Sequence, residues 1–314
     1  MRRHGRDGKL CVWDMSRADQ EWDKTLPVEQ TSSHRREPWL LHSLPTSMLT
    51  FCSFATCKDS NNASDSGIMD RLLVTLPGET DSTIIIYQLP TEKHIGLIPA
   101  PPTSAGKTGM VMAMKISHLA GGHLIVIAGY ESGRTCMFRQ EGITGKWEII
   151  YNNRPHEQPL LSLDVAPSLD YYLTSGADAI VAKHPVAAHG GATEPLKTVQ
   201  TKHAGQQGLC IRSDGKIFAT SGWDGRARIY SCKSMKELAV LKWHREGCYS
   251  IAFANIDPAN NDEGSDREDG QEIVTTTGSQ ITPAFTQARN TKTQNTHWVV
   301  VGSKDRKISL WEIF

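Results

Sequence analysis

The sequence predicts an all-β fold of radially repeated sheets, a β-propeller, and three observations lead to this prediction. A hairpin motif recurs along the 314 residues, it keeps one internal spacing, and its copies are separated by roughly the length of a propeller blade. The aromatic positions of the motif are 13, 87, 138, 184, 230 and 311, so the three intervals between 87 and 230 are 51, 46 and 46 residues.

The clearest copy of the motif spans residues 219–230. Its turn, Asp224-Gly225, separates a short apolar strand from an alternating strand that reaches Tyr230, which is the pattern of a β-hairpin. Because side chains alternate along a strand, a fixed interval from turn to aromatic brings the ring to one face of the sheet, against the neighbouring blade. The same six-residue interval recurs in the other copies: Asp7 to Trp13, Asp81 to Tyr87, Ser132 to Phe138, Asp178 to His184 and Asp305 to Trp311.

A turn that contains histidine is expected to open each blade. It is clear at His203 and His244 and weaker at His156 and His42, while the blade at 112–116 lacks a clear histidine. These histidines are therefore interpreted as hydrogen-bonded core residues rather than as catalytic or metal-binding ones.

The repeat predicts one propeller domain over residues 1–314, with about five complete blades and one terminal hairpin at 5–14. A polar insertion at 15–37 lengthens the first interval. An acidic and polar insertion at 255–296 lengthens the last, and it contains too few large apolar residues to fold, so we expect disorder. Propellers close by strand pairing between the first and last blades. We therefore expect a seven-bladed parent, N-terminally truncated here to an incomplete ring, with a six-bladed ring as the alternative.

Residues of the last two copies resemble the buried network of the WD-repeat family, in which an aspartate binds turn backbone and histidine and an aromatic closes the network. They are His203, Ser221, Asp224 and Tyr230 in one copy, and His244, Ser303, Asp305 and Trp311 in the other. Segments 216–241 and 302–311, which follow one another in this order, and segment 4–13 are similar to sequences of the fungal ASTRA-associated protein 1 family. They also resemble its animal relative, guanine nucleotide-binding protein β-subunit-like protein 1.

This resemblance implies a non-catalytic scaffold in the ASTRA complex, linked to chromatin remodelling and to the TTT co-chaperone that matures phosphatidylinositol-3-kinase-related kinases. The implied partners are ASTRA and TTT protein subunits, and the implied location is the nucleus, with the cytoplasm as a second compartment. The alternative is a WD-repeat adaptor of another assembly, such as a ubiquitin-ligase substrate receptor or a signalling scaffold.

Composition argues against other classes of function. Lys plus Arg and Asp plus Glu both total 34, so no overall charge draws the chain to nucleic acid or to an anionic membrane. No apolar run approaches the ~18 residues of a transmembrane helix. The chain also lacks a phosphate-binding loop, a nucleophile elbow and a zinc-protease motif. We therefore predict no enzyme, no catalytic residue, no cofactor and no small-molecule substrate.

The cysteines do not form a recognisable metal site. Cys52 and Cys57 are separated by four residues, and no second Cys or His pair lies at zinc-finger spacing, so no metal is predicted. The seven cysteines are an odd, scattered set, which indicates small core residues in a reducing compartment.

Overall fold

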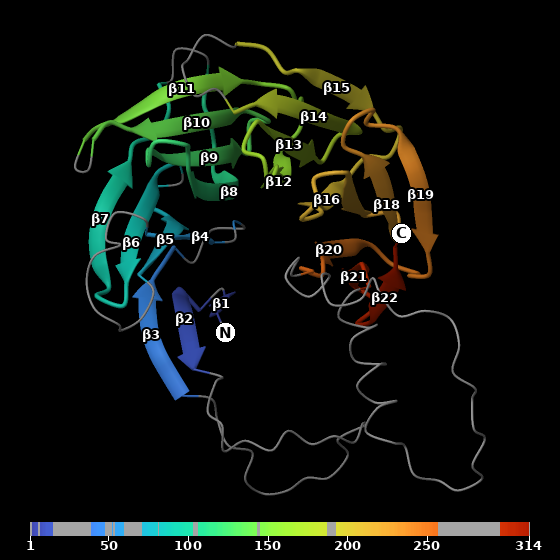
Figure 1. Cartoon of the computed structure of the whole chain (residues 1–314), viewed down its shortest axis with the longest axis horizontal. Helices are drawn as coiled ribbons and strands as arrows, with labels where there is room; N and C mark the ends of the chain where they lie inside the picture. Colours follow the sequence, from blue (N-terminus) through green and yellow to red (C-terminus); the bar gives the residue numbers. More distant parts are fainter. Residues whose placement is uncertain are drawn as a thin grey trace, which may run out of the picture. The chain divides into compact units, whose positions relative to one another are not determined.

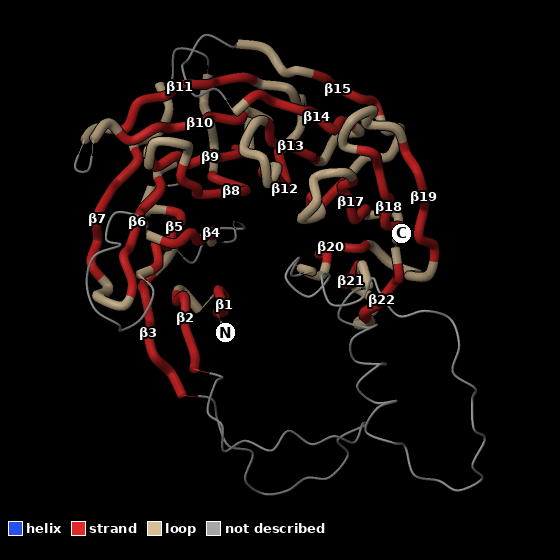
Figure 2. The backbone as a smooth tube through the Cα atoms, in the orientation of Figure 1, coloured by secondary structure: helices blue, strands red, loops and turns tan. Residues whose placement is uncertain are grey.

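The computed structural model describes residues 2–5, 7–14, 39–47, 52, 54–59, 71–80, 82–102, 106–142, 145–186, 193–256 and 296–313. Within them the regular secondary structure consists of strands (Figure 2). The chain divides into two compact units, one of Met1–Leu161 with Ala187–Pro195 and one of Ser162–Val186 with Leu196–Phe314. The expected insertion at 15–37 and almost all of that at 255–296 lie outside the described residues, and the single-domain organisation stays a prediction.

The first unit contains three antiparallel sheets (Figure 1). Sheet I consists of β1 (Arg2–Gly5), β2 (Lys9–Asp14) and β3 (Trp39–Pro45). Sheet II consists of β4 (Ala55–Lys58), β5 (Leu72–Pro77), β6 (Ile84–Leu89) and β7 (Lys93–Ile98). Sheet III consists of β8 (Val111–His118), β9 (Leu124–Tyr130), β10 (Thr135–Gln140) and β11 (Trp147–Asn153).

The second unit contains three more antiparallel sheets. Sheet IV consists of β12 (Leu160–Val165), whose first two residues belong to the first unit, β13 (Tyr171–Gly176), β14 (Ile180–Pro185) and β15 (Lys197–Gln200). Sheet V consists of β16 (Gln206–Ile211), β17 (Ile217–Gly222), β18 (Arg226–Ser231) and β19 (Glu237–Lys242). Sheet VI consists of β20 (Cys248–Phe253), β21 (Trp298–Ser303) and β22 (Ile308–Glu312).

The second strand of sheet V, β17, is buried because sheets IV and VI of the same unit cover its two faces. Along β17, Ile217 and Ala219 pack into the core shared with sheet VI, whereas Phe218, between them, packs into the core shared with sheet IV. Alternation along a strand sends these side chains to opposite faces. Every residue of β17 is buried, the polar Thr220 and Ser221 included, because both faces of the strand are covered.

The motif aromatics occupy equivalent points of their sheets. In four sheets, the pairing of the third strand with the fourth, or of β2 with β3, shifts register immediately before the motif aromatic. The shifts lie at Val12/Trp13, Ile86/Tyr87, Met137/Phe138 and Ile229/Tyr230. A β-bulge at one repeated position means that the six-residue interval found in the sequence describes one structural slot.

The strand count differs from expectation at both ends of the chain. The terminal hairpin gains a third strand, β3, and within the described residues sheet VI has three strands, so four sheets have four strands. His42 lies on β3 opposite Val12 rather than ahead of an opening strand, and its Nδ1 is 2.9 Å from the Glu92 carboxylate. The sequence shows no strand pattern for β3, because Trp39, Leu40 and Leu41 are consecutive apolar residues that do not alternate with polar ones. All three are exposed.

Candidate functional site: the turn networks of sheets V and VI

The expected network of sheet VI is present, with one member that sequence reasoning missed. His244 Nδ1 lies 3.0 Å from the Asp305 carboxylate, and His244 Nε2 lies 2.9 Å from Ser309 Oγ. Trp311 Nε1 donates to the same Ser309 oxygen at 2.9 Å. The Asp305 carboxylate can only accept, so His244 donates to it through Nδ1–H. In the neutral imidazole Nε2 then accepts from the Ser309 hydroxyl, whose oxygen also accepts from Trp311 Nε1–H. Ser309 could have been found from its position two residues before Trp311, on the same face of β22.

Ser303 belongs to the turn itself rather than to the link between histidine and tryptophan. Its Oγ donates to the carbonyls of Glu246 and Gly247, both at 3.1 Å, and accepts from the Asp305 amide at 3.3 Å. It therefore ties the β21–β22 turn to the loop that opens sheet VI.

Asp305 accepts backbone as well as side-chain hydrogen bonds. The amides of Lys307 and Arg245 donate to its carboxylate at 3.0 and 3.4 Å. Burial opposes ionisation of Asp305, but the hydrogen bonds from His244 and from the two amides outweigh it and lower the pKa of the carboxyl below its ordinary value. The residue is held as an anion that organises two segments of the chain.

In sheet V an arginine takes the place expected for histidine. Arg228, on β18, is 1% exposed and donates to both Asp224 oxygens, at 3.2 and 2.6 Å. Its Nε lies 3.6 Å from Glu237. Burial alone would raise the pKa of Asp224, but the hydrogen bonds and charge of Arg228 lower it below its ordinary value.

The other expected members of the sheet V network are not joined to Asp224 by side-chain hydrogen bonds. Ser221 Oγ is buried and has no hydrogen-bond partner among the residues that the structure describes. Tyr230 stacks on Phe218 with ring centroids 5.0 Å apart. The carbonyl of His203 accepts from Thr201 and from Gln206, at 3.2 and 3.1 Å. The expectation of a histidine network in this sheet is therefore replaced by an Asp-Arg pair.

In sheet IV the expected pair occupies neighbouring parts of one hairpin. Asp178 accepts from the Ile180 amide at 3.2 Å in the β13–β14 turn. His184 fills the motif's aromatic slot on β14, where it is fully buried, lies 3.0 Å from Thr174 Oγ1 and stacks on Tyr172 at 4.7 Å.

In the first unit the motif positions mainly pack. Phe138 is buried in the core shared by sheets II and III. Tyr87 contacts His94 edge to face at 5.8 Å. Trp13 is half-buried on β2, and Asp7 is exposed in the β1–β2 turn. Asp81 lies outside the described residues.

Burial keeps several thiols protonated. All seven cysteines are free, and burial raises the pKa of Cys248 to about 11 and that of Cys57 to about 12. The described part of the chain contains no group of three His, Cys, Asp or Glu side chains placed to hold a metal ion. It also contains no helix with the length and apolar character needed to cross a membrane.

Comparison with known proteins identifies the repeat. The family described as "WD domain, G-beta repeat" matches residues 194–231, which include β15 of sheet IV and β16 to β18 of sheet V. Together with the antiparallel four-stranded sheets, this match confirms the predicted all-β WD-repeat propeller class.

Several fungal proteins are similar along most of this chain. ASTRA-associated protein 1 of Penicillium rubens is 43% identical, with 99% of this chain and 81% of the relative covered. The protein of that name in Aspergillus flavus is 42% identical, covering 99% and 80%. The one in Schizosaccharomyces pombe is 38% identical, covering 80% and 75%.

Proposed function

This chain belongs to the ASTRA-associated protein 1 family, and we propose that it acts as a non-catalytic WD-repeat scaffold in the ASTRA complex. The observation that carries the proposal is 43% identity over 99% of the chain to a relative whose name states that association. The family resemblance expected from the sequence is thereby confirmed.

The use of polar side chains supports a scaffold. His244, Asp305 and Ser309 bond to one another, and Asp305 also holds turn amides. Asp224 is paired with a buried arginine. The side chains of His244 and Asp305 are 3% and 12% exposed, and Ser309 is buried with its oxygen also bonded to Trp311. These groups therefore fix the geometry of the turns and do not face solvent. Turns and loops held on rigid sheets are suited to presenting a binding surface.

We propose in addition that the protein works in the nucleus, contributes to chromatin regulation, and connects the complex to the TTT co-chaperone that matures phosphatidylinositol-3-kinase-related kinases. Family membership supports these finer assignments.

Affinity purification followed by mass spectrometry tests the proposal. The protein is tagged at its own locus, and an unrelated WD-repeat protein with the same tag serves as the control. ASTRA and TTT subunits enriched over the control are the expected result. Recovery of cullin adaptors without ASTRA or TTT subunits would instead identify a ubiquitin-ligase substrate receptor, and would overturn the assignment.

A further inference from the structure

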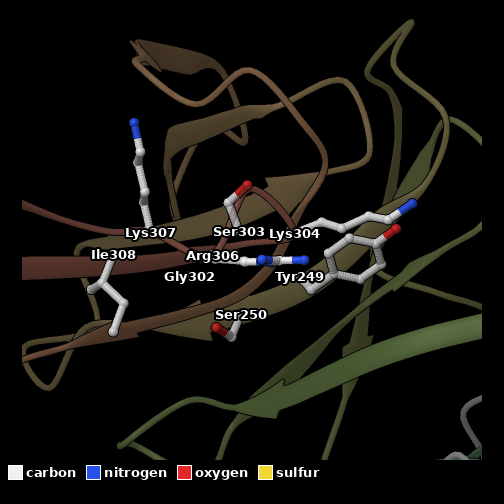
Figure 3. Close-up of a pocket in the computed structure, with 8 residues that line it drawn as sticks. All are labelled: Tyr249, Ser250, Gly302, Ser303, Lys304, Arg306, Lys307 and Ile308. Atoms are coloured by element: carbon white, nitrogen blue, oxygen red, sulfur yellow. The ribbon is translucent and has the colours of Figure 1, made fainter.

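A shallow pocket lies beside the β21–β22 turn of sheet VI, with a volume of about 330 Å³ (Figure 3). Tyr249 and Ser250 of β20 line one part of it, and Lys304, Arg306 and Ile308 line another. In Figure 3, Lys304 and Arg306 extend beside the ring of Tyr249, whereas Lys307 points away from it. The pocket thus combines an aromatic ring, an aliphatic side chain and two cations.

The surroundings of the pocket carry an excess of uncommitted positive charge. Residues 223–226, 243–249 and 303–308 contain five Lys or Arg and three Asp or Glu. Two of these acids are engaged, Asp224 with Arg228 and Asp305 with His244. Lys304 and Arg306 are exposed, and neither forms a salt bridge with any residue that the structure describes. The local charge therefore favours an anionic ligand although the whole chain is neutral.

Exposed apolar side chains adjoin these cations. Tyr249 is 46% exposed and Ile308 is 73% exposed. Trp243 is 52% exposed, with Lys307 Nζ 5.5 Å from its ring centroid. Aromatic residues and arginine are enriched where proteins bind one another, whereas a solvated charged surface gains nothing from such rings.

The loop beneath the pocket is held in place by backbone contacts. The Lys304 amide donates to the Gly247 carbonyl at 2.9 Å. A Cβ added to Gly247 would lie 3.2 Å from the Tyr249 ring and from the Trp223 carbonyl. The backbone that carries the pocket residues is therefore positioned before any ligand arrives, which lowers the entropy cost of ordering it on binding.

We propose that this surface, defined by Tyr249, Lys304, Arg306 and Ile308, docks a short acidic segment of a partner protein. Carboxylates of the segment pair with Lys304 and Arg306, and an apolar side chain of the segment lies against Tyr249 and Ile308. The inference concerns this surface alone and holds whichever complex the chain serves.

A short peptide suits the surface better than nucleic acid. Single-stranded nucleic acid is bound along a continuous cationic groove that neutralises successive phosphates. Here most of the cations come from one turn, 304–307, and Glu246 lies exposed near them. A segment with a few acids around one apolar residue matches both the charge and the size of the pocket.

Fluorescence anisotropy with the purified 314-residue chain tests the proposal. The probe is a fluorescein-labelled peptide of Glu-Asp-Leu repeats, and the control peptide has Gln-Asn-Leu repeats. The double variant Lys304→Glu/Arg306→Glu should weaken binding of the acidic probe about tenfold at low salt, because two exposed charge contacts become repulsive. Ile308→Ser should weaken it about threefold, because apolar contact area is lost.

Matched variants distinguish binding at this surface from a general effect of the protein's charge. Lys233→Glu/Lys236→Glu makes the same change of charge at two exposed lysines in the β18–β19 turn and should leave the affinity unchanged. Lys304→Glu alone serves if the double variant does not fold. Equal weakening by both double variants, equal binding of the control peptide, or no binding of the acidic probe would each overturn the proposal. Displacement of the probe by oligo-dT at lower concentration than by unlabelled peptide would assign the surface to nucleic acid.

Discussion

The guanidinium of Arg228 is buried against the carboxylate of Asp224, with its Nη2 2.6 Å from Oδ2. The two residues are four positions apart on one hairpin, so the pair forms locally once the β17–β18 turn closes. Asp224 corresponds to Asp305 of the neighbouring sheet, and Arg228, four residues later, corresponds to Ser309. Asp224 is therefore paired from the strand, whereas Asp305 is paired from the opening loop by His244.

Removing the Asp224 carboxylate should destabilise the fold, because the buried Arg228 cation loses its nearest counter-charge. Within the described part of the chain, Asp224→Ala leaves the more distant Glu237 as the remaining carboxylate beside Arg228, and we expect a loss of about 1 to 3 kcal/mol of unfolding free energy. The double variant Asp224→Ala/Arg228→Met should recover part of the loss, because no charge then remains buried. Urea denaturation of the three proteins measures both effects, and an unchanged stability of Asp224→Ala would remove the pair from the stabilising network.

Ser309→Ala should destabilise sheet VI by about 1 to 3 kcal/mol, because it leaves both His244 Nε2 and Trp311 Nε1 without their common partner. Ser213→Ala, at an exposed serine in the β16–β17 turn, is the matched control and should change little. The comparison is made by thermal unfolding of the two variants. Equal effects of both substitutions would contradict the bridging role of Ser309.

Backbone conformation at the second turn position predicts opposite effects in two sheets. Arg306 has φ of 64° where the equivalent Gly225 has φ of 76°. Arg306→Gly relieves about 1 kcal/mol of left-handed strain but adds freedom to the unfolded chain, so stability should stay the same or rise by up to about 1 kcal/mol. Gly225→Ala should lower stability by at least about 1 kcal/mol, because its Cβ would also lie 3.0 Å from the Glu246 carbonyl. Chemical denaturation measures both, and a destabilised Arg306→Gly variant would show that the arginine side chain contributes more than its backbone costs.

Low pH should destabilise the second unit, because aspartates that are ionised in the folded state become protonated. Hydrogen bonds and charge from Arg228 and Arg212 hold the pKa of Asp224 and of Asp214, respectively, below their ordinary values despite opposing burial. A carboxyl with a lowered pKa in the folded state contributes stability above its unfolded pKa of about 3.9 and loses it as pH falls through the folded pKa. The melting temperature should therefore decrease as the pH is lowered below about 4. The decrease should be smaller in the Asp224→Asn variant. A variant with the same acid dependence as the parent would contradict the linkage.

The features that depend on local geometry, the hairpin motif and its spacing, could be predicted from the sequence. The interval from turn to aromatic follows from strand alternation, and the register shifts at Trp13, Tyr87, Phe138 and Tyr230 confirm that it marks one structural position. The fold class follows from the repetition of that hairpin.

Contacts between distant residues were harder to predict. His244 and Asp305 are 61 positions apart. Strand alternation places Ser309 on the same face of β22 as Trp311, but it does not show that Ser309 also reaches His244. Arg228 was overlooked because a charged residue in an alternating strand reads as solvent-facing, whereas a neighbouring carboxylate allows it to be buried. Strand β3 lacked alternation and so gave no periodic signal.

The bulges beside Tyr87 and Tyr230 make the fourth strands of sheets II and V, β7 and β19, equivalent in their pairing. β7 and β19 each have six residues and meet their partners with the same one-residue offset. Transplanting one in place of the other preserves which side chains face inward, whereas deleting a single residue ahead of the bulge turns the remainder of the strand inside out. Insertions and deletions are therefore tolerated in the loops on either side of β7 and β19. Within either strand, a change in the number of residues would disrupt the pairing of all six positions.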